Sequence, residues 1–98
     1  MRYKVYYNKG LRMSPEKLAA QVAHVTLNLG FHLGNHIADF LDPLEQTIIV
    51  LGLSATKFKR VLEELEEEAL HREIVYHVQK DLGYTEIEAG TKTAFGFI

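Results

Sequence analysis

The sequence of 98 residues contains no cysteine. This absence excludes a disulfide-stabilised fold, a thiolate zinc site, a cysteine nucleophile and an iron–sulfur cluster. No apolar run is long enough to span a bilayer, because polar side chains such as Gln21, His24 and Asn28 interrupt the longest stretch. The first residues lack the apolar segment and the cleavage site of a signal peptide. We therefore expect a cytoplasmic protein with no membrane segment.

Acidic residues are unevenly distributed along the chain. The formal net charge is −2, but five of the 13 acidic residues lie at 63–68, and the remaining 11 basic and 8 acidic residues leave a net charge of +3. We expect residues 63–68 to be the solvated face of a helix. We expect the cations to form a basic face elsewhere. That face would contain Lys9, Arg12, Lys17, Lys80 and Lys92.

The length is that of one domain, which we place at 1–98. Periodicity and turn residues predict alternating strands and helices. In order, we expect a strand at 2–7, a helix from Ser14-Pro15 to about Leu29 that stops at Gly30, a strand at 46–51, a helix capped by Ser54, and strands at 73–78 and 93–98. Residues 31–45 give mixed signals.

This order of elements predicts an α/β fold. Its sheet would be mostly parallel, with helices on its faces and functional loops at the carboxyl ends of its strands. The β-branched run at 47–51 is typical of a central strand covered on both faces. The last strand follows a loop rather than a helix, so we expect it to run antiparallel to its neighbour.

The first helix carries a single polar stripe, formed by Lys17, Gln21, His24 and Asn28. The stripe could simply be the side that faces solvent. Lys17, however, occupies the third helical position, where the helix dipole disfavours a cation. An anion bound beside the helix start would favour a lysine there, which makes Lys17 a candidate binding or catalytic residue.

The second candidate segment is the loop from Asp81 to Thr93, which begins at the carboxyl end of a predicted strand. It begins with a carboxylate and contains three threonines, a lysine and two glycines, although these could be ordinary turn and strand residues. Because both segments lie at the same edge of the predicted sheet, we expect Lys17 and Asp81 to approach each other across one cleft.

Other chemistries have less support in the sequence. His32, His36 and Asp39 resemble a set of metal ligands, but the intervening glycine and asparagine argue against one helical face, so we expect no metal or other cofactor. There is no Gly-x-Ser-x-Gly motif for a serine nucleophile.

Taken together, the segments 12–24 and 79–96 resemble the archaeal and eukaryotic-type peptidyl-tRNA hydrolases. The first contains Ala-Ala-Gln followed by His24, and the second matches the family's Asp-x-Gly-x-Thr-x-Ile pattern without a gap as far as Gly96. The resemblance implies a three-layer α/β/α domain with a four-stranded mixed sheet. It also implies a homodimer that hydrolyses the ester between a peptide and tRNA.

The resemblance assigns roles to individual residues. It implies catalytic roles for Lys17, Asp81, Thr85 and Thr93 and places Gln21 and His24 at the same site. We expect the tRNA acceptor end to contact a basic rim and the loop beside it. The residues that we expect to make these contacts are Lys9, Arg12, Lys80, Thr91 and Lys92.

Three residues depart from the family's usual pattern, namely Glu16, Tyr84 and Ala89. They leave two alternatives open. One is a binding or dimerisation module of the same fold without tRNA hydrolysis, and the other is a hydrolase of a different small ester or amide.

Overall fold

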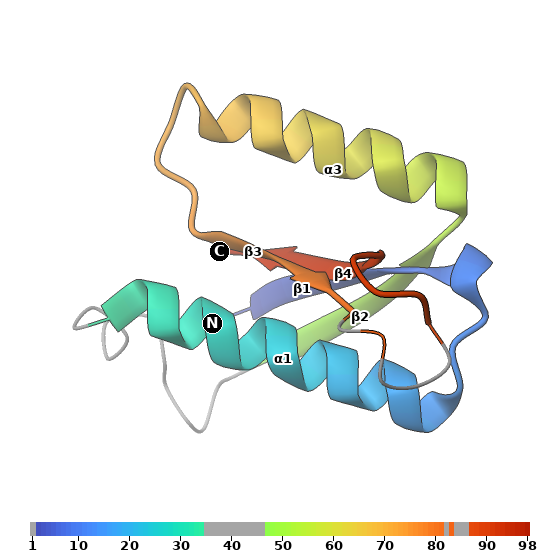
Figure 1. Ribbon diagram of the computed structural model, residues 1–98. Helices are drawn as coiled ribbons and strands as arrows, with labels where there is room; N and C mark the ends of the chain where they lie inside the picture. Colours follow the sequence, from blue (N-terminus) through green and yellow to red (C-terminus); the bar gives the residue numbers. More distant parts are fainter. Residues whose placement is uncertain (1, 35–46, 82, 84–86) are drawn as a thin grey trace.

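The computed structural model describes residues 2–34, 47–81, 83 and 87–98. Its elements are β1 (Arg2–Asn8), the short 3-10 helix η1 (Lys9–Leu11), α1 (Pro15–Leu33), β2 (Thr47–Leu53), α3 (Ala55–Ala69), β3 (Tyr76–Lys80) and β4 (Lys92–Phe97). Figure 1 shows the two long helices on opposite sides of one sheet. Among the described residues, no helix is long and apolar enough to cross a membrane.

The four strands form one mixed sheet in the order β2-β1-β4-β3. β1 pairs with β2 in parallel, and β4 is antiparallel to both β1 and β3. It follows that β1, β2 and β3 point in one direction and β4 in the other, so the predicted antiparallel last strand is confirmed. The carboxyl ends of three strands and the start of β4 consequently share one edge of the sheet.

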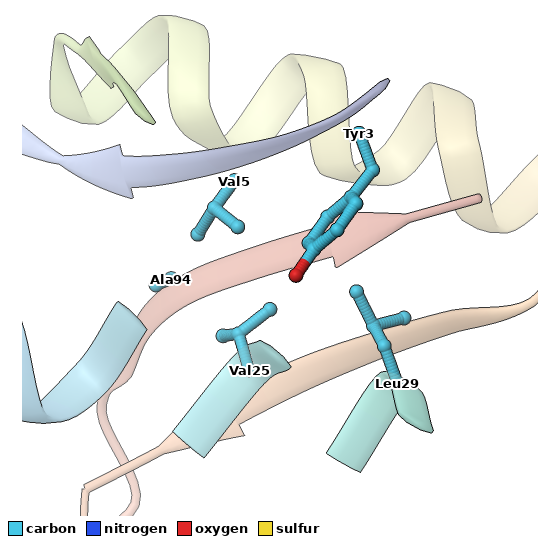
Figure 2. Packing of buried hydrophobic residues seen from close by; sticks show 5 residues of the cluster. All are labelled: Tyr3, Val5, Val25, Leu29 and Ala94. Atoms are coloured by element: carbon cyan, nitrogen blue, oxygen red, sulfur yellow. The ribbon is translucent and has the colours of Figure 1, made fainter. Parts of the chain in front are cut away.

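A separate apolar cluster holds each helix against the sheet. On one face, α1 packs over the strands through a cluster made up of Tyr3, Val5, Val25, Leu29 and Ala94 (Figure 2). On the other face, α3 packs through Phe58, Leu62 and Leu65 against Phe95 of the sheet. The fold is therefore the three-layer α/β/α arrangement that the resemblance implies.

α3 follows the pattern predicted for it. The Ser54 hydroxyl accepts a hydrogen bond from the Lys57 amide at 3.3 Å and so caps the helix start. The apolar stripe faces the sheet, and most of the glutamates at 63–68 are exposed. This glutamate run lies in the layer opposite α1.

Two predicted boundaries are wrong. α1 passes through Gly30 and ends at Gly34, whose φ of 56° lies in the left-handed region that favours glycine. Burial of Leu29 and Leu33 against the rest of the protein compensates for the weak helix propensity of Gly30. The third strand is displaced toward the carboxyl end, because it begins at Tyr76 rather than at residue 73.

The predicted central position of β2 is also wrong, because β2 is an edge strand. Ile48, Val50 and Leu51 are 43%, 42% and 38% exposed. Composition indicates how well a strand suits an apolar environment, but the order of strands depends on long-range pairing, which a local run of residues does not encode.

Candidate functional site

Asp81 lies directly after β3, at the edge of the sheet where the strand ends meet. Backbone hydrogen bonds hold it on both sides, from its own amide to the Thr91 carbonyl at 2.9 Å and from the Gly90 amide to its carbonyl at 2.7 Å. The residue is 5% exposed. The end of β3 and the loop before β4 therefore fix the carboxylate within the protein.

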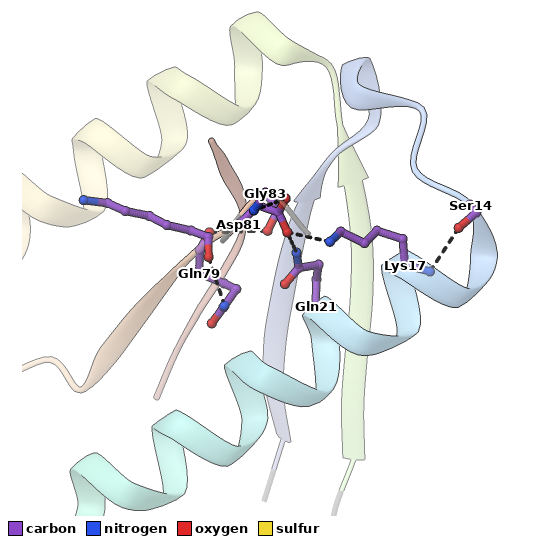
Figure 3. A network of polar contacts seen from close by, with 8 residues as sticks. Ser14, Lys17, Gln21, Gln79, Asp81 and Gly83 are labelled. Atoms are coloured by element: carbon purple, nitrogen blue, oxygen red, sulfur yellow. Dashed lines mark hydrogen bonds and ion pairs between the residues drawn. The ribbon is translucent and has the colours of Figure 1, made fainter. Parts of the chain in front are cut away.

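Lys17 reaches this carboxylate from the first turn of α1. Its Nζ lies 2.5 Å from Asp81 Oδ1, so the predicted approach of the two side chains is confirmed (Figure 3). Its backbone amide donates to the hydroxyl of Ser14, the residue that caps the helix, at 3.1 Å. The ion pair with Asp81 offsets the unfavourable position of a cation near the helix start.

Gln21, one helical turn beyond Lys17, completes the cluster from the helix side. Its Nε2 donates to Asp81 Oδ1 at 3.2 Å, and the residue is 2% exposed. Its Oε1 is buried and has no hydrogen-bond partner among the residues that the structure describes. Such a group usually carries a free-energy cost, which functional sites tolerate more often than ordinary cores do.

The loop contributes a backbone donor through Gly83. Its amide donates to Asp81 Oδ2 at 3.1 Å. The φ of Gly83 is +83°, and a Cβ at this position would lie 2.8 Å from the Cβ of Ala89. Only glycine suits this conformation and this close contact. Both oxygens of the Asp81 carboxylate therefore accept hydrogen bonds.

These contacts lower the pKa of Asp81. The hydrogen bond from Lys17 lowers it below the ordinary value of 3.8, and burial of the carboxylate acts in the opposite direction. The Gly83 amide, the positive charge of Lys17 and the Gln21 amide lower the pKa further. The carboxylate is therefore ionised at neutral pH, and it is a weaker base than an ordinary aspartate.

The polar stripe of α1 divides into two parts. Lys17 and Gln21 face Asp81, whereas His24 is exposed to solvent. Asn28 donates through Nδ2 to the backbone carbonyl of His24 at 2.8 Å. Only the first half of the stripe thus belongs to the carboxylate cluster.

Thr93 is fully buried in β4, and its hydroxyl donates to the Gln79 carbonyl at 3.3 Å. The pairing of β3 with β4 shifts register between Gln79 and Lys80, immediately before Asp81. Thr93 therefore supports the strand end from which the carboxylate projects. Thr91 contributes through its backbone carbonyl, which binds the Asp81 amide.

The predicted basic residues gather at the same edge of the sheet. Lys9 and Arg12 lie between β1 and α1, Lys80 ends β3, and Lys92 begins β4; all four are exposed. The glutamate run lies in the carboxyl half of α3, far from this edge (Figure 1). These four cations therefore lie apart from the glutamate run, and the basic face that they would form stays a prediction.

Several predictions fall outside the described residues. They concern Thr85 as a catalytic residue, Tyr84 as a departure from the family pattern, His36 and Asp39 as candidate metal ligands, and the part of the mixed segment 31–45 that follows residue 34.

The Gly83 amide is a donor to Asp81 that was not predicted from the sequence. Asp-x-Gly is a pattern in which the aspartate side chain accepts a bond from the amide two residues later, so the signal was present. Gln79 was also missed, and its backbone role at the register shift has no signal in the local sequence.

Comparison with known proteins agrees with this geometry. The model of the family described as Peptidyl-tRNA hydrolase PTH2 matches residues 2–98. A peptidyl-tRNA hydrolase from Haloquadratum walsbyi is 34% identical over 93 residues, covering 95% of this chain and 80% of the relative. Another, from Methanopyrus kandleri, is 34% identical over 89 residues, covering 88% and 73% respectively.

Proposed function

The chain belongs to the peptidyl-tRNA hydrolase PTH2 family, and from this premise we propose that its Lys17–Gln21–Asp81 cluster hydrolyses the ester between a peptide and the terminal ribose of tRNA. The observation that carries the proposal is the contact between the Lys17 ammonium and the buried Asp81 carboxylate. A cation held beside a fixed carboxylate suits a reaction in which negative charge develops on an ester oxygen.

The electrostatic role belongs to Lys17. Attack of water on the ester carbonyl places negative charge on the carbonyl oxygen, and the Lys17 ammonium stabilises that charge. Asp81 holds the ammonium in position, because its Oδ1 is 2.5 Å from Nζ. Preorganisation of this kind removes the cost of orienting the cation during the reaction.

The attacking water is oriented by Asp81. Its lowered pKa makes it a weak proton acceptor but keeps it ionised, so it aligns the water through an accepted hydrogen bond. The water supplies a hydroxyl group to the peptide acyl carbon and a proton to the leaving ribose oxygen. The products are a free peptide and a tRNA with a free terminal hydroxyl.

The neighbouring residues support this pair. Gln21 and the Gly83 amide fix the orientation of the Asp81 carboxylate. Thr93 acts as a positioning residue through the end of β3. From the family resemblance we assign a catalytic role to Thr85 and substrate contact to His24, and we assign Thr91 to the loop that contacts the tRNA acceptor end.

We assign the tRNA half of the substrate to the basic edge of the sheet. Lys9, Arg12, Lys80 and Lys92 are exposed there and can contact phosphates of the acceptor end. A phosphate contact positions the tRNA without taking part in the reaction, which leaves the chemistry to Lys17 and Asp81.

The test is hydrolysis of an N-acetylaminoacyl-tRNA, with release of free tRNA as the measurement. We expect turnover by the wild-type protein and its loss in Lys17→Met, with Lys57→Met on α3 as the matched control. Tight tRNA binding without release of tRNA would instead support the non-hydrolytic module. No observation on the described residues favours that alternative.

We also propose a homodimer and a cytoplasmic location, where tRNA substrates occur. The exposed apolar residues of the edge strand β2 support the dimer, because an edge strand without charged residues can pair with a second chain. Sedimentation over a range of protein concentrations tests it, and a monomer at all concentrations would contradict it.

A further inference from the structure

The pairing of β3 with β4 contains one extra residue next to the carboxylate cluster. Gln79 pairs with Ala94. The following residue of β3, Lys80, pairs with Lys92 and not with Thr93. Thr93 is therefore left over in β4, which is the pattern of a β-bulge. Its side chain is buried, and its hydroxyl donates to the Gln79 carbonyl at 3.3 Å, so that Thr93 fixes the shift in register.

The shift places two lysines, Lys80 and Lys92, directly opposite each other. Opposed residues of antiparallel strands have Cβ atoms about 4.5–5.5 Å apart, and like charges in such a pair are unfavourable. Both side chains are exposed, and neither forms an ion pair with a carboxylate of the described residues. In a regular ladder Lys80 would instead face the uncharged Thr93. An anion bound between the two ammonium groups would offset their repulsion.

This lysine pair lies on the face of the sheet opposite to the Asp81 carboxylate. Successive side chains of a strand point to opposite faces. Val78 packs in the apolar cluster beneath α3, so Lys80, two residues later, shares the α3 face. Asp81 points to the α1 face, where its carboxylate contacts Lys17. The lysine pair and the proposed catalytic pair therefore share one edge of the sheet but lie on its two sides.

We propose that Lys80 and Lys92 together bind a single phosphate group of the tRNA acceptor end on the α3 side of this edge. This inference rests on the proposed function, because the phosphate is placed relative to an ester bound beside Lys17 on the α1 side. Phosphate groups are the anions of tRNA, and a lysine ammonium binds phosphate as a compact charge with several donors. The acceptor strand consequently crosses the edge of the sheet.

Joint binding of one phosphate differs in its salt dependence from two independent contacts. Each phosphate that a protein neutralises contributes about one unit to the slope of log affinity against log salt concentration. Lys80→Ala, Lys92→Ala and the double variant should therefore each lower the slope by about one unit. The affinity lost in the double variant should likewise be well below the two single losses combined. Two separate phosphates would give a slope change of about two units in the double variant.

The measurement is a titration of the protein with uncharged tRNA, which carries no ester to hydrolyse, over a series of salt concentrations. Lys9→Ala/Lys92→Ala is the matched control, because Lys9 is an exposed residue of η1 and is not a strand partner of Lys92. These two residues should contact different phosphates, so this double variant should lower the slope by about two units.

A second measurement tests the repulsion without tRNA. Lys80→Gln removes one charge of the lysine pair, so its free energy of unfolding should exceed that of the wild type at low salt. The difference should disappear at high salt, because salt screens exposed charges. Lys59→Gln on α3 is the control and should show no such gain, since Lys59 has no lysine opposite it across a strand pair.

Each outcome decides between the alternatives. A slope change of about two units in Lys80→Ala/Lys92→Ala, no gain in stability in Lys80→Gln at low salt, or a wild type that does not bind tRNA would overturn the joint phosphate site. A wild type that shows the expected slopes but releases no tRNA from an N-acetylaminoacyl-tRNA would support the joint site and contradict the proposed function.

Discussion

The carboxylate of Asp81 accepts hydrogen bonds from Lys17, Gln21 and Gly83 while it is almost entirely shielded from solvent. In Asp81→Asn the side chain keeps its shape but loses the negative charge that holds the Lys17 ammonium. We expect turnover to fall about 10²- to 10⁴-fold with little change in KM, because the lost interaction acts in the transition state.

Saturation kinetics with an N-acetylaminoacyl-tRNA measure this effect. Glu88→Gln is the matched control, since Glu88 is an exposed carboxylate of the same connection and should retain activity. Full activity of Asp81→Asn would remove Asp81 from the mechanism and leave His24 as the next candidate for orienting the attacking water.

The same carboxylate gives a prediction about stability and pH. Because the pKa of Asp81 is lowered in the folded protein, its contribution to the free energy of unfolding is fully present above the ordinary pKa of 3.8. That contribution is lost as the pH falls through the lower folded-state pKa. We expect the wild type to have a higher free energy of unfolding than Asp81→Asn at neutral pH, and this difference should disappear below about pH 4. Denaturant unfolding at several pH values measures it. A constant difference down to pH 2 would contradict the assignment.

At the scale of elements, the contact between α1 and β4 depends on Gly96. A Cβ at this position would lie 2.8 Å from Val25 Cγ1 and 3.1 Å from the Lys4 carbonyl oxygen. Gly96→Ala should therefore push the helix from the sheet and lower the free energy of unfolding by about 1–3 kcal/mol. Chemical denaturation measures the loss.

Val25→Ala offers a control for this crowding, because it removes the nearest atom. The double variant Val25→Ala/Gly96→Ala should lose less stability than the two single losses combined. Strict additivity would mean that Gly96 acts through the backbone of β4 and not through contact with α1.

At the scale of the whole molecule, charge is divided between the basic edge of the sheet and the carboxyl half of α3. Lys92→Ala should weaken tRNA binding and reduce the slope of log affinity against log salt concentration by about one unit, while turnover at saturation changes little. Binding titrations over a series of salt concentrations measure the slope. Lys59→Ala is the control, because Lys59 is an exposed residue of α3, and it should leave the slope unchanged.

Local patterns in the sequence predicted much of this fold. Ser14 and Ser54 predicted where the two long helices begin, because a capping hydroxyl accepts a hydrogen bond from the amide only three residues later. The stripe around Phe58 and Leu62 marked the buried face of α3, since helical spacing is a property of the chain itself. The pairing of Lys17 with Asp81 followed from the rule that strand ends meet at one edge.

Capping residues and hydrophobic periodicity were enough to predict the type and order of the elements, the cap of each long helix and the basic residues at the carboxyl ends of the strands. Three features could not be predicted in this way: β2 is an edge strand, α1 continues to Leu33, and Gln21 faces Asp81 while His24 faces solvent. Capping and periodicity act between residues a few positions apart. Strand order, helix length against a packed face, and the burial of one polar side chain depend instead on contacts between residues far apart in the chain.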